Sequence, residues 1–176
     1  RDRAERDRRR SGACAPVWRR LGELDRARRR RVVRAEAGDE QEPVARMLYE
    51  EMFFCEVKNG GLFDFGDYCD SPDGLVGSDG EVEIKSVIAS THEATIKRGS
   101  FDPAYRWQMA GHFDKGREWI DFVSYCADYP DHLQLVVFRT YRDEMADEIA
   151  KLSERRAQFL ELVAQKESEL TQRKVA

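Results

Sequence analysis

The feature that most constrains this chain is a short segment of alternating residues that runs from Glu81 to Ile88. Alternation is typical of a β-strand, because successive side chains of a strand point to opposite faces of the sheet. Val82 and Ile84 then lie on one face, and Glu83 and Lys85 lie on the other. The segment therefore predicts a strand that carries a carboxylate and an ammonium group side by side.

The composition fits one globular domain, with 41% hydrophobic residues in 176. No apolar run approaches the roughly 20 residues that a membrane-spanning helix needs, and the N-terminal region lacks the apolar core of a signal peptide. We therefore expect a cytoplasmic protein with no membrane partner. The four cysteines form no CxxC pair, which argues against a structural zinc site and favours free thiols.

Charge is distributed unevenly along the chain. Residues 1–37 hold 14 Arg and six acidic residues, whereas the remainder holds 16 basic and 28 acidic residues. Such a segment can be a basic arm that binds nucleic acid, but its apolar positions keep no steady period. We predict that residues 1–37 form an Arg-rich segment that is disordered or non-native, and that residues 38–176 form the functional domain.

Periodicity and turn residues predict the remaining elements. Helices are expected at residues 39–52, 105–113 and 143–173. Strands are expected at residues 53–57, within 62–77, and at 119–127 and 133–141, with a loop over residues 89–103. Helices that alternate with strands in this order predict an α/β domain with a mixed central β-sheet flanked by helices.

The residues that could bind a metal ion are concentrated in Ser71-Pro72-Asp73-Gly74 and in the strand that follows it. A divalent metal such as Mg²⁺ prefers oxygen ligands, and a turn between the two segments can bring Asp73 and Glu83 together. The carbonyl of Ile84 is a third candidate ligand, and Lys85 lies on the same face as Glu83. The alternative is structural, with Asp73 in an ordinary turn and an exposed Glu83–Lys85 ion pair that contributes little.

Four elements in the same order resemble the lambda-exonuclease and YqaJ-type phage recombinase family, which belongs to the PD-(D/E)xK nuclease superfamily. Glu42 matches a Glu-Pro element that opens a helix, and residues 71–74 match a Ser/Thr-Pro-Asp-Gly element. Residues 83–85 match a Glu-Ile/Leu-Lys strand, and Tyr105 with Gln108 matches a Tyr-x-x-Gln helix. The resemblance covers about 100 residues and implies a restriction-endonuclease-like core.

The resemblance also implies roles for these residues. The expected ligands of Mg²⁺ or Mn²⁺, with two ions in the site, are Asp73, Glu83, Glu42 and the carbonyl of Ile84. Lys85 is expected to orient or activate the attacking water, and Gln108 to position the water or the scissile phosphate. All five side chains are therefore candidate catalytic residues.

The implied reaction is hydrolysis of phosphodiester bonds in linear duplex DNA from a free end, in the 5′→3′ direction. The implied setting is homologous recombination of a phage or prophage in the cytoplasm of a bacterial host. Family members often form rings, so a homotrimeric ring and a single-strand annealing protein are expected partners. Lys97, Arg98 and Tyr105 are candidates for contacts with DNA phosphates and bases.

Two alternatives stay open at the level of sequence. The chain could be a PD-(D/E)xK endonuclease or resolvase of another branch, which would not depend on a free DNA end. It could also be an inactive module that binds DNA ends. The histidines His92, His112 and His132 are predicted to be structural or exposed, because metal-bound water needs no histidine base.

Overall fold

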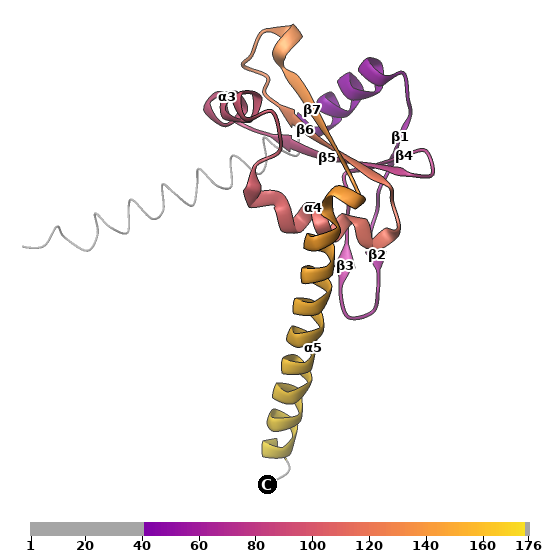
Figure 1. Ribbon diagram of the computed structural model, residues 1–176, viewed down its shortest axis with the longest axis vertical. Coiled ribbons are helices and arrows are strands. Elements are labelled where there is room, and N and C mark those ends of the chain that lie inside the picture. Colours follow the sequence, from indigo (N-terminus) through magenta and orange to yellow (C-terminus); the bar gives the residue numbers. More distant parts are fainter. Residues whose placement is uncertain (1–40, 175–176) are drawn as a thin grey trace, which may run out of the picture. The chain divides into compact units, whose positions relative to one another are not determined.

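A five-stranded mixed sheet lies at the centre of the computed structural model, which describes residues 41–174 (Figure 1). The order of its strands is β1-β4-β5-β6-β7. They are β1 (Val57–Asn59), β4 (Gly74–Val76), β5 (Gly80–Ser86), β6 (Trp119–Tyr125) and β7 (Leu135–Tyr141). A separate hairpin pairs β2 (Phe63–Asp64) with β3 (Cys69–Asp70). The predicted α/β class with a mixed sheet is confirmed.

One parallel pair, β5 with β6, organises the sheet, and the other pairings are antiparallel. Parallel neighbours need a long crossover connection, which is usually helical. Here the crossover contains α3 (Ala89–Arg98) and α4 (Arg106–His112), with short 3-10 turns around α4. The crossover therefore brings helical residues back over β5, the strand that carries Glu83.

The two faces of the sheet bury different clusters, as the alternation in β5 predicts. The helix of residues 41–53, drawn in indigo in Figure 1, packs on the first face. That cluster comprises Ala45, Tyr49, Val57, Val82, Ile84, Val123, Tyr125 and Leu135. The second cluster lies under α4 and the start of the C-terminal helix, and comprises Met109, Ala110, Phe113, Ile120, Phe122 and Met145.

An ionic network around the buried carboxylate of Asp121 ties the helix of residues 41–53 to the sheet. The hydroxyl of Tyr49 donates to Asp121 Oδ2 at 2.6 Å. Arg139 donates to both oxygens of the same carboxylate, at 2.8 Å each, and its guanidinium lies 3.7 Å from the centre of the Trp119 ring. Three donors satisfy the buried Asp121, so its desolvation is compensated.

The C-terminal helix α5 (Ala146–Lys174) follows a 3-10 turn at Asp143–Met145. Ile149 and Leu152 pack against the second cluster. In the sequence, Arg156 occupies a position where the helical period of α5 would favour an apolar residue. The structure gives Arg156 two partners. It donates to Asp114 at 2.6 Å and lies 3.8 Å from the centre of the Tyr68 ring, so it links α5 to the β2–β3 hairpin.

Two predicted elements were wrong. The expected loop over residues 89–103 contains helix α3, whose buried face carries His92 and Thr95 in place of large apolar residues. His92 replaces apolar packing with hydrogen bonds to Ser124 Oγ and the Leu133 carbonyl, both at 2.8 Å. The hydrophobic period that usually marks a helix is therefore absent from this segment.

The strand expected at residues 53–57 is the second error. The preceding helix continues to residue 53, and Phe54 adopts a φ of 51° as the chain leaves it. Both Phe53 and Phe54 are exposed, so the apolar run does not mark a buried strand. Strand β1 begins only at Val57.

The predictions for residues 1–37 lie outside the described residues, as does Cys14. The described cysteines, Cys55, Cys69 and Cys126, are free thiols. Among residues 41–174, none of the helices combines the length and the apolar character that crossing a bilayer requires.

Replacement of Gly80 by Ala is expected to destabilise the fold, because a Cβ there would overlap the Trp119 indole on the paired strand. Overpacking of this kind costs roughly 1–3 kcal/mol. Gly111→Ala is the matched control, because its Cβ would meet Leu152 at an ordinary 3.7 Å and it raises helix propensity by up to about 1 kcal/mol. Urea denaturation should move the two midpoints in opposite directions, and an unchanged midpoint for Gly80→Ala would contradict the expectation.

Candidate metal centre

The site begins where the antiparallel ladder between β4 and β5 stops. The register pairs Gly74 with Val82, so extending the ladder by two residues would place Pro72 opposite Ile84. Proline has no amide hydrogen, so Pro72 could not donate to the Ile84 carbonyl. The Ile84 amide donates to the Asp73 side chain, 2.7 Å from Oδ2. Since the N–H and C=O of one strand residue point the same way, the Ile84 carbonyl also faces the edge that carries Asp73.

Glu83 is the most buried acidic group of the site, with 1% of the residue exposed. Its Oε1 accepts hydrogen bonds from Lys85 Nζ and from Gln108 Nε2, the latter at 2.6 Å, and its Oε2 lies 3.0 Å from His112 Nε2. Burial raises the pKa of Glu83, but the hydrogen bond from His112 and the charge of Lys85 outweigh it and keep the pKa below its usual value. The alternative of an exposed Glu83–Lys85 pair is therefore wrong.

Asp73 is placed in the opposite electrostatic situation. Burial and the charge of Glu83 raise its pKa to about 6, with a smaller contribution from Glu42, against the Ile84 hydrogen bond and the charge of Lys85. The negative charges of Glu83 and Glu42 thus act on Asp73, although Lys85 and Arg46 pair with those two carboxylates. Oxygen donors concentrated in this way suit a hard divalent cation, so the residues present fit the metal that the sequence suggests.

Arg46 is a part of the site that the sequence analysis missed. It lies one helical turn after Glu42, donates to Glu42 Oε1 at 3.1 Å, and also donates to the backbone carbonyl of Asp73. It therefore connects the helix of residues 41–53 to the Pro72-Asp73 turn. The i, i+4 spacing from Glu42 was the available signal, but the bond to Asp73 spans 27 residues.

Lys85 remains charged in this environment. Burial lowers its pKa, yet the carboxylates of Glu83 and Asp73 outweigh that effect and raise the pKa above its usual value. The Lys85 ammonium lies 5.3 Å from the centre of the Tyr105 ring. An ammonium group thus sits beside the acidic groups, where it can interact with a negatively charged phosphate.

The candidate DNA contacts differ in their surroundings. Tyr105 is half-buried and packs against Phe122, with ring centres 5.4 Å apart. Lys97 and Arg98 are exposed on the last turn of α3 and form ion pairs with acidic residues close by in the sequence. Their proposed contacts with DNA stay predictions.

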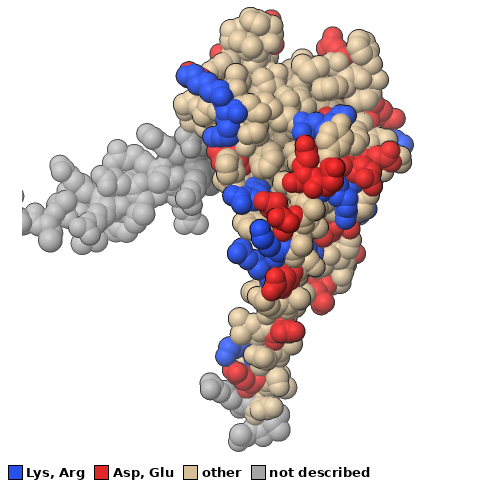
Figure 2. All heavy atoms as spheres, viewed as in Figure 1, with Lys and Arg blue, Asp and Glu red and all other residues tan. Residues whose placement is uncertain are grey.

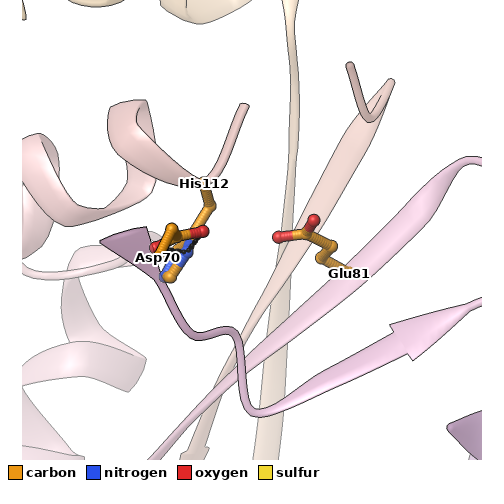
Figure 3. A group of neighbouring side chains, drawn as sticks. All are labelled: Asp70, Glu81 and His112. Carbon is orange, nitrogen blue, oxygen red and sulfur yellow. Dashed lines mark hydrogen bonds and ion pairs between the residues drawn. The ribbon is translucent and has the colours of Figure 1, made fainter. Parts of the chain in front are cut away.

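A second cluster of ionisable groups lies behind Glu83. His112 Nδ1 is 2.9 Å from an oxygen of Asp70, whose other oxygen accepts from Lys115. Lys115 Nζ is also 3.2 Å from Glu81 Oε2. Figure 3 shows the Glu81 carboxylate pointing from its strand toward Asp70 and His112. The sequence predicted His112 to be structural or exposed, and the structure places it in direct contact with Glu83.

Burial dominates the electrostatics of this second cluster. It raises the pKa of Glu81 to about 7, and it lowers the pKa of Lys115 to about 8 with help from the charge of Arg117. Both carboxylate oxygens of Glu81 are buried without a well-oriented hydrogen bond. The candidate ligand atoms of Asp70, Glu81 and His112 lie within 4.8 Å of one another, which also fits a divalent metal.

Charges of both signs appear on the face of the molecule drawn in Figure 2. Acidic and basic side chains are interspersed there over the middle and lower parts of the described residues. No continuous basic stripe is visible on that face within residues 41–174. This face therefore offers a polyanion local basic residues rather than one continuous basic surface.

Comparison with known proteins identifies solved structures that are similar to this one. The crystal structures of an alkaline exonuclease from Laribacter hongkongensis, alone and in complex with dAMP, are each 34% identical in sequence with a TM-score of 0.62. The match covers 78% of this chain and 75% of that chain.

A phage-related exonuclease from Haemophilus somnus 129PT shares the fold, with 16% identity, a TM-score of 0.55, and coverage of 76% and 73%. No family model matches the sequence, and neither does any curated protein. The identity and coverage of the Laribacter enzyme nevertheless confirm the family predicted from the motifs. This chain belongs to the lambda-exonuclease and YqaJ-type family of nucleases.

Proposed function

We propose that this protein is a metal-dependent deoxyribonuclease that degrades linear duplex DNA from an end, in the 5′→3′ direction, during phage-type recombination. The proposal rests on one observation. Asp73, Glu83 and Lys85 lie together next to Pro72, where the β4–β5 ladder ends. Membership of an exonuclease family supports the same reaction class.

The residues at the end of the β4–β5 ladder would hold two Mg²⁺ or Mn²⁺ ions. Asp73, Glu83 and the Ile84 carbonyl would bind directly, and Glu42 would approach from its helix. When bound, the metal would polarise the scissile phosphate and make water a better nucleophile. Lys85 would orient the attacking water and stabilise negative charge on the phosphoryl oxygens. Gln108, which donates to Glu83 at 2.6 Å, would keep that carboxylate aligned and position the water or phosphate.

Substrate binding would use the few basic and aromatic groups near this edge. Lys97 and Arg98 would contact phosphates, and binding would weaken as salt rises because counterions are released on association. Tyr105 would present its partly exposed ring to a base. A homotrimeric ring that encloses the duplex, and an annealing protein that receives the exposed strand, complete the proposal.

Lys85→Ala is expected to reduce cleavage of linear duplex DNA by roughly 10²–10⁴-fold, because an electrostatic group beside the reacting phosphate is lost. The assay compares linear and closed circular duplex DNA, with Mg²⁺ and with EDTA. Lys166→Ala is the matched control, because that lysine is exposed on α5 and pairs only with Glu169 among its described ionic neighbours. The control should retain wild-type activity.

Each outcome of this assay supports one of three functions for the protein. Loss of the linear substrate alone, only with metal and only when Lys85 is intact, supports the exonuclease. Cutting of the closed circle would assign an endonuclease or resolvase in its place. Binding of DNA ends without metal-dependent cleavage would assign an inactive end-binding module.

Asp73→Asn is expected to stabilise the metal-free protein above pH 7. The folded protein holds the Asp73 proton more tightly than the unfolded chain, since its pKa rises from 3.8 to about 6. Ionised Asp73 therefore lowers stability progressively as pH rises across that window, and the whole cost is present above pH 6. Asparagine keeps an acceptor for the Ile84 amide and removes the charge, so the gain should be roughly 1–3 kcal/mol.

Thermal denaturation in EDTA at pH 8 and at pH 4 measures this difference, which should be large at pH 8 and small at pH 4. Added Mg²⁺ should raise the melting temperature of the wild type at pH 8 and leave that of Asp73→Asn unchanged. A variant that is less stable than the wild type at pH 8, or that still responds to Mg²⁺, would count against Asp73 as a metal ligand.

A further inference from the structure

The cluster behind Glu83 has no assigned task in the reaction proposed above. It holds three carboxylates and three basic groups that are partly or fully buried, and Figure 3 shows three of the six side chains. These residues are Asp70, Glu81, Glu83, His112, Lys115 and Arg117. Asp70, Glu81 and His112 approach closely enough to hold a cation, so a second metal site is the first function to consider.

Lys115 already supplies the cation for this cluster. Its ammonium donates to Asp70 and lies 3.2 Å from Glu81 Oε2, with only 2% of its side chain exposed. The ring nitrogens of His112 are both engaged, Nδ1 by Asp70 and Nε2 by Glu83. A metal ion would have to displace Lys115 and break a bond of His112, so the cluster is better suited to hold Glu83 than to bind a second metal.

His112 is well placed to fix the orientation of Glu83. It lies four residues after Gln108 on α4, so both side chains project from the same face of the helix. Gln108 reaches Glu83 Oε1 at 2.6 Å, and His112 reaches Glu83 Oε2 at 3.0 Å. One helix therefore holds both oxygens of a carboxylate that lies on a strand, and this removes its freedom to rotate.

Asp70 in turn fixes the ring of His112. It lies three residues before Asp73 on the same segment, and its two oxygens are 2.9 and 3.0 Å from His112 Nδ1. A carboxylate, an imidazole and a second carboxylate are thus joined in one hydrogen-bonded chain.

We propose that His112, held by Asp70, is a positioning residue that fixes the Glu83 carboxylate in the orientation needed to bind the metal. This inference rests on the proposed function of Glu83 as a metal ligand. Hydrogen-bonded partners of ligating groups typically contribute 10–100-fold to metal affinity. Lys115 pairs with both Asp70 and Glu81, and Arg117 lies 3.7 Å from Glu81, so cationic side chains already face these carboxylates.

The test compares His112→Gln with His112→Asn. The amide nitrogen of Gln reaches the position of Nε2 and can still donate to Glu83, whereas that of Asn reaches the position of Nδ1 and can donate only to Asp70. Both substitutions remove the same ring and leave a neutral amide, so they are matched in polarity and charge. Binding of Mn²⁺ to each full-length protein is measured by electron paramagnetic resonance, which detects free Mn²⁺ independently of cleavage.

His112→Asn is expected to bind Mn²⁺ roughly 10–100-fold more weakly than His112→Gln. Equal Mn²⁺ affinity of the two variants, with the wild type binding normally, would overturn the inference and leave the proposed function standing. Failure of the wild type to bind Mn²⁺ would overturn both.

Thermal denaturation in EDTA shows whether the variants fold. If both His112 variants unfold, Asp70→Asn takes their place, because its side chain is 17% exposed and is more easily replaced. Weaker Mn²⁺ binding by several-fold would then support the inference, and unchanged binding would overturn it.

Discussion

The whole site depends on the point at which Pro72 ends a ladder of backbone hydrogen bonds. Opposite a residue with an amide hydrogen, Ile84 would pair both its N–H and its C=O with β4, and the edge would be closed. Because proline cannot donate, the Ile84 carbonyl receives no hydrogen bond from position 72. The Ile84 amide donates to the Asp73 side chain at 2.7 Å, which holds Asp73 beside the part of β5 that carries Glu83 and Lys85.

Burying the charges of Glu83 and Asp73 is costly, and the fold provides the two carboxylates with different numbers of hydrogen bonds. Glu83 receives hydrogen bonds from three side chains, and its pKa stays low. Asp73 receives one, and repulsion from Glu83 contributes to a pKa of about 6. Ionised Asp73 is therefore destabilised in the folded, metal-free domain. This arrangement is typical of sites in which stability is sacrificed for function.

Contacts on both faces of the sheet hold the Pro72-Asp73 turn and the adjoining part of β5 in place. On one face, Tyr49 and Arg139 share the buried carboxylate of Asp121 and secure the helix that carries Glu42 and Arg46. On the other, α4 lies in the crossover that the parallel β5–β6 pair requires. That crossover places Gln108 and His112 over Glu83, so the topology of the sheet determines which residues support the site.

The sequence by itself determined the parts of this protein that depend on local spacing. Alternation in β5 predicted that Glu83 and Lys85 share a face, Pro72-Asp73 and the following turn predicted the acidic pair, and the order of the motifs indicated the family. Only the tertiary structure revealed the contacts of Arg46 and His112, whose bonds to Asp73 and Glu83 span 27 and 29 residues. The periodicity of a sequence shows which face of its own helix or strand a residue occupies. The residue that it contacts on that face depends on how elements distant in the sequence pack together.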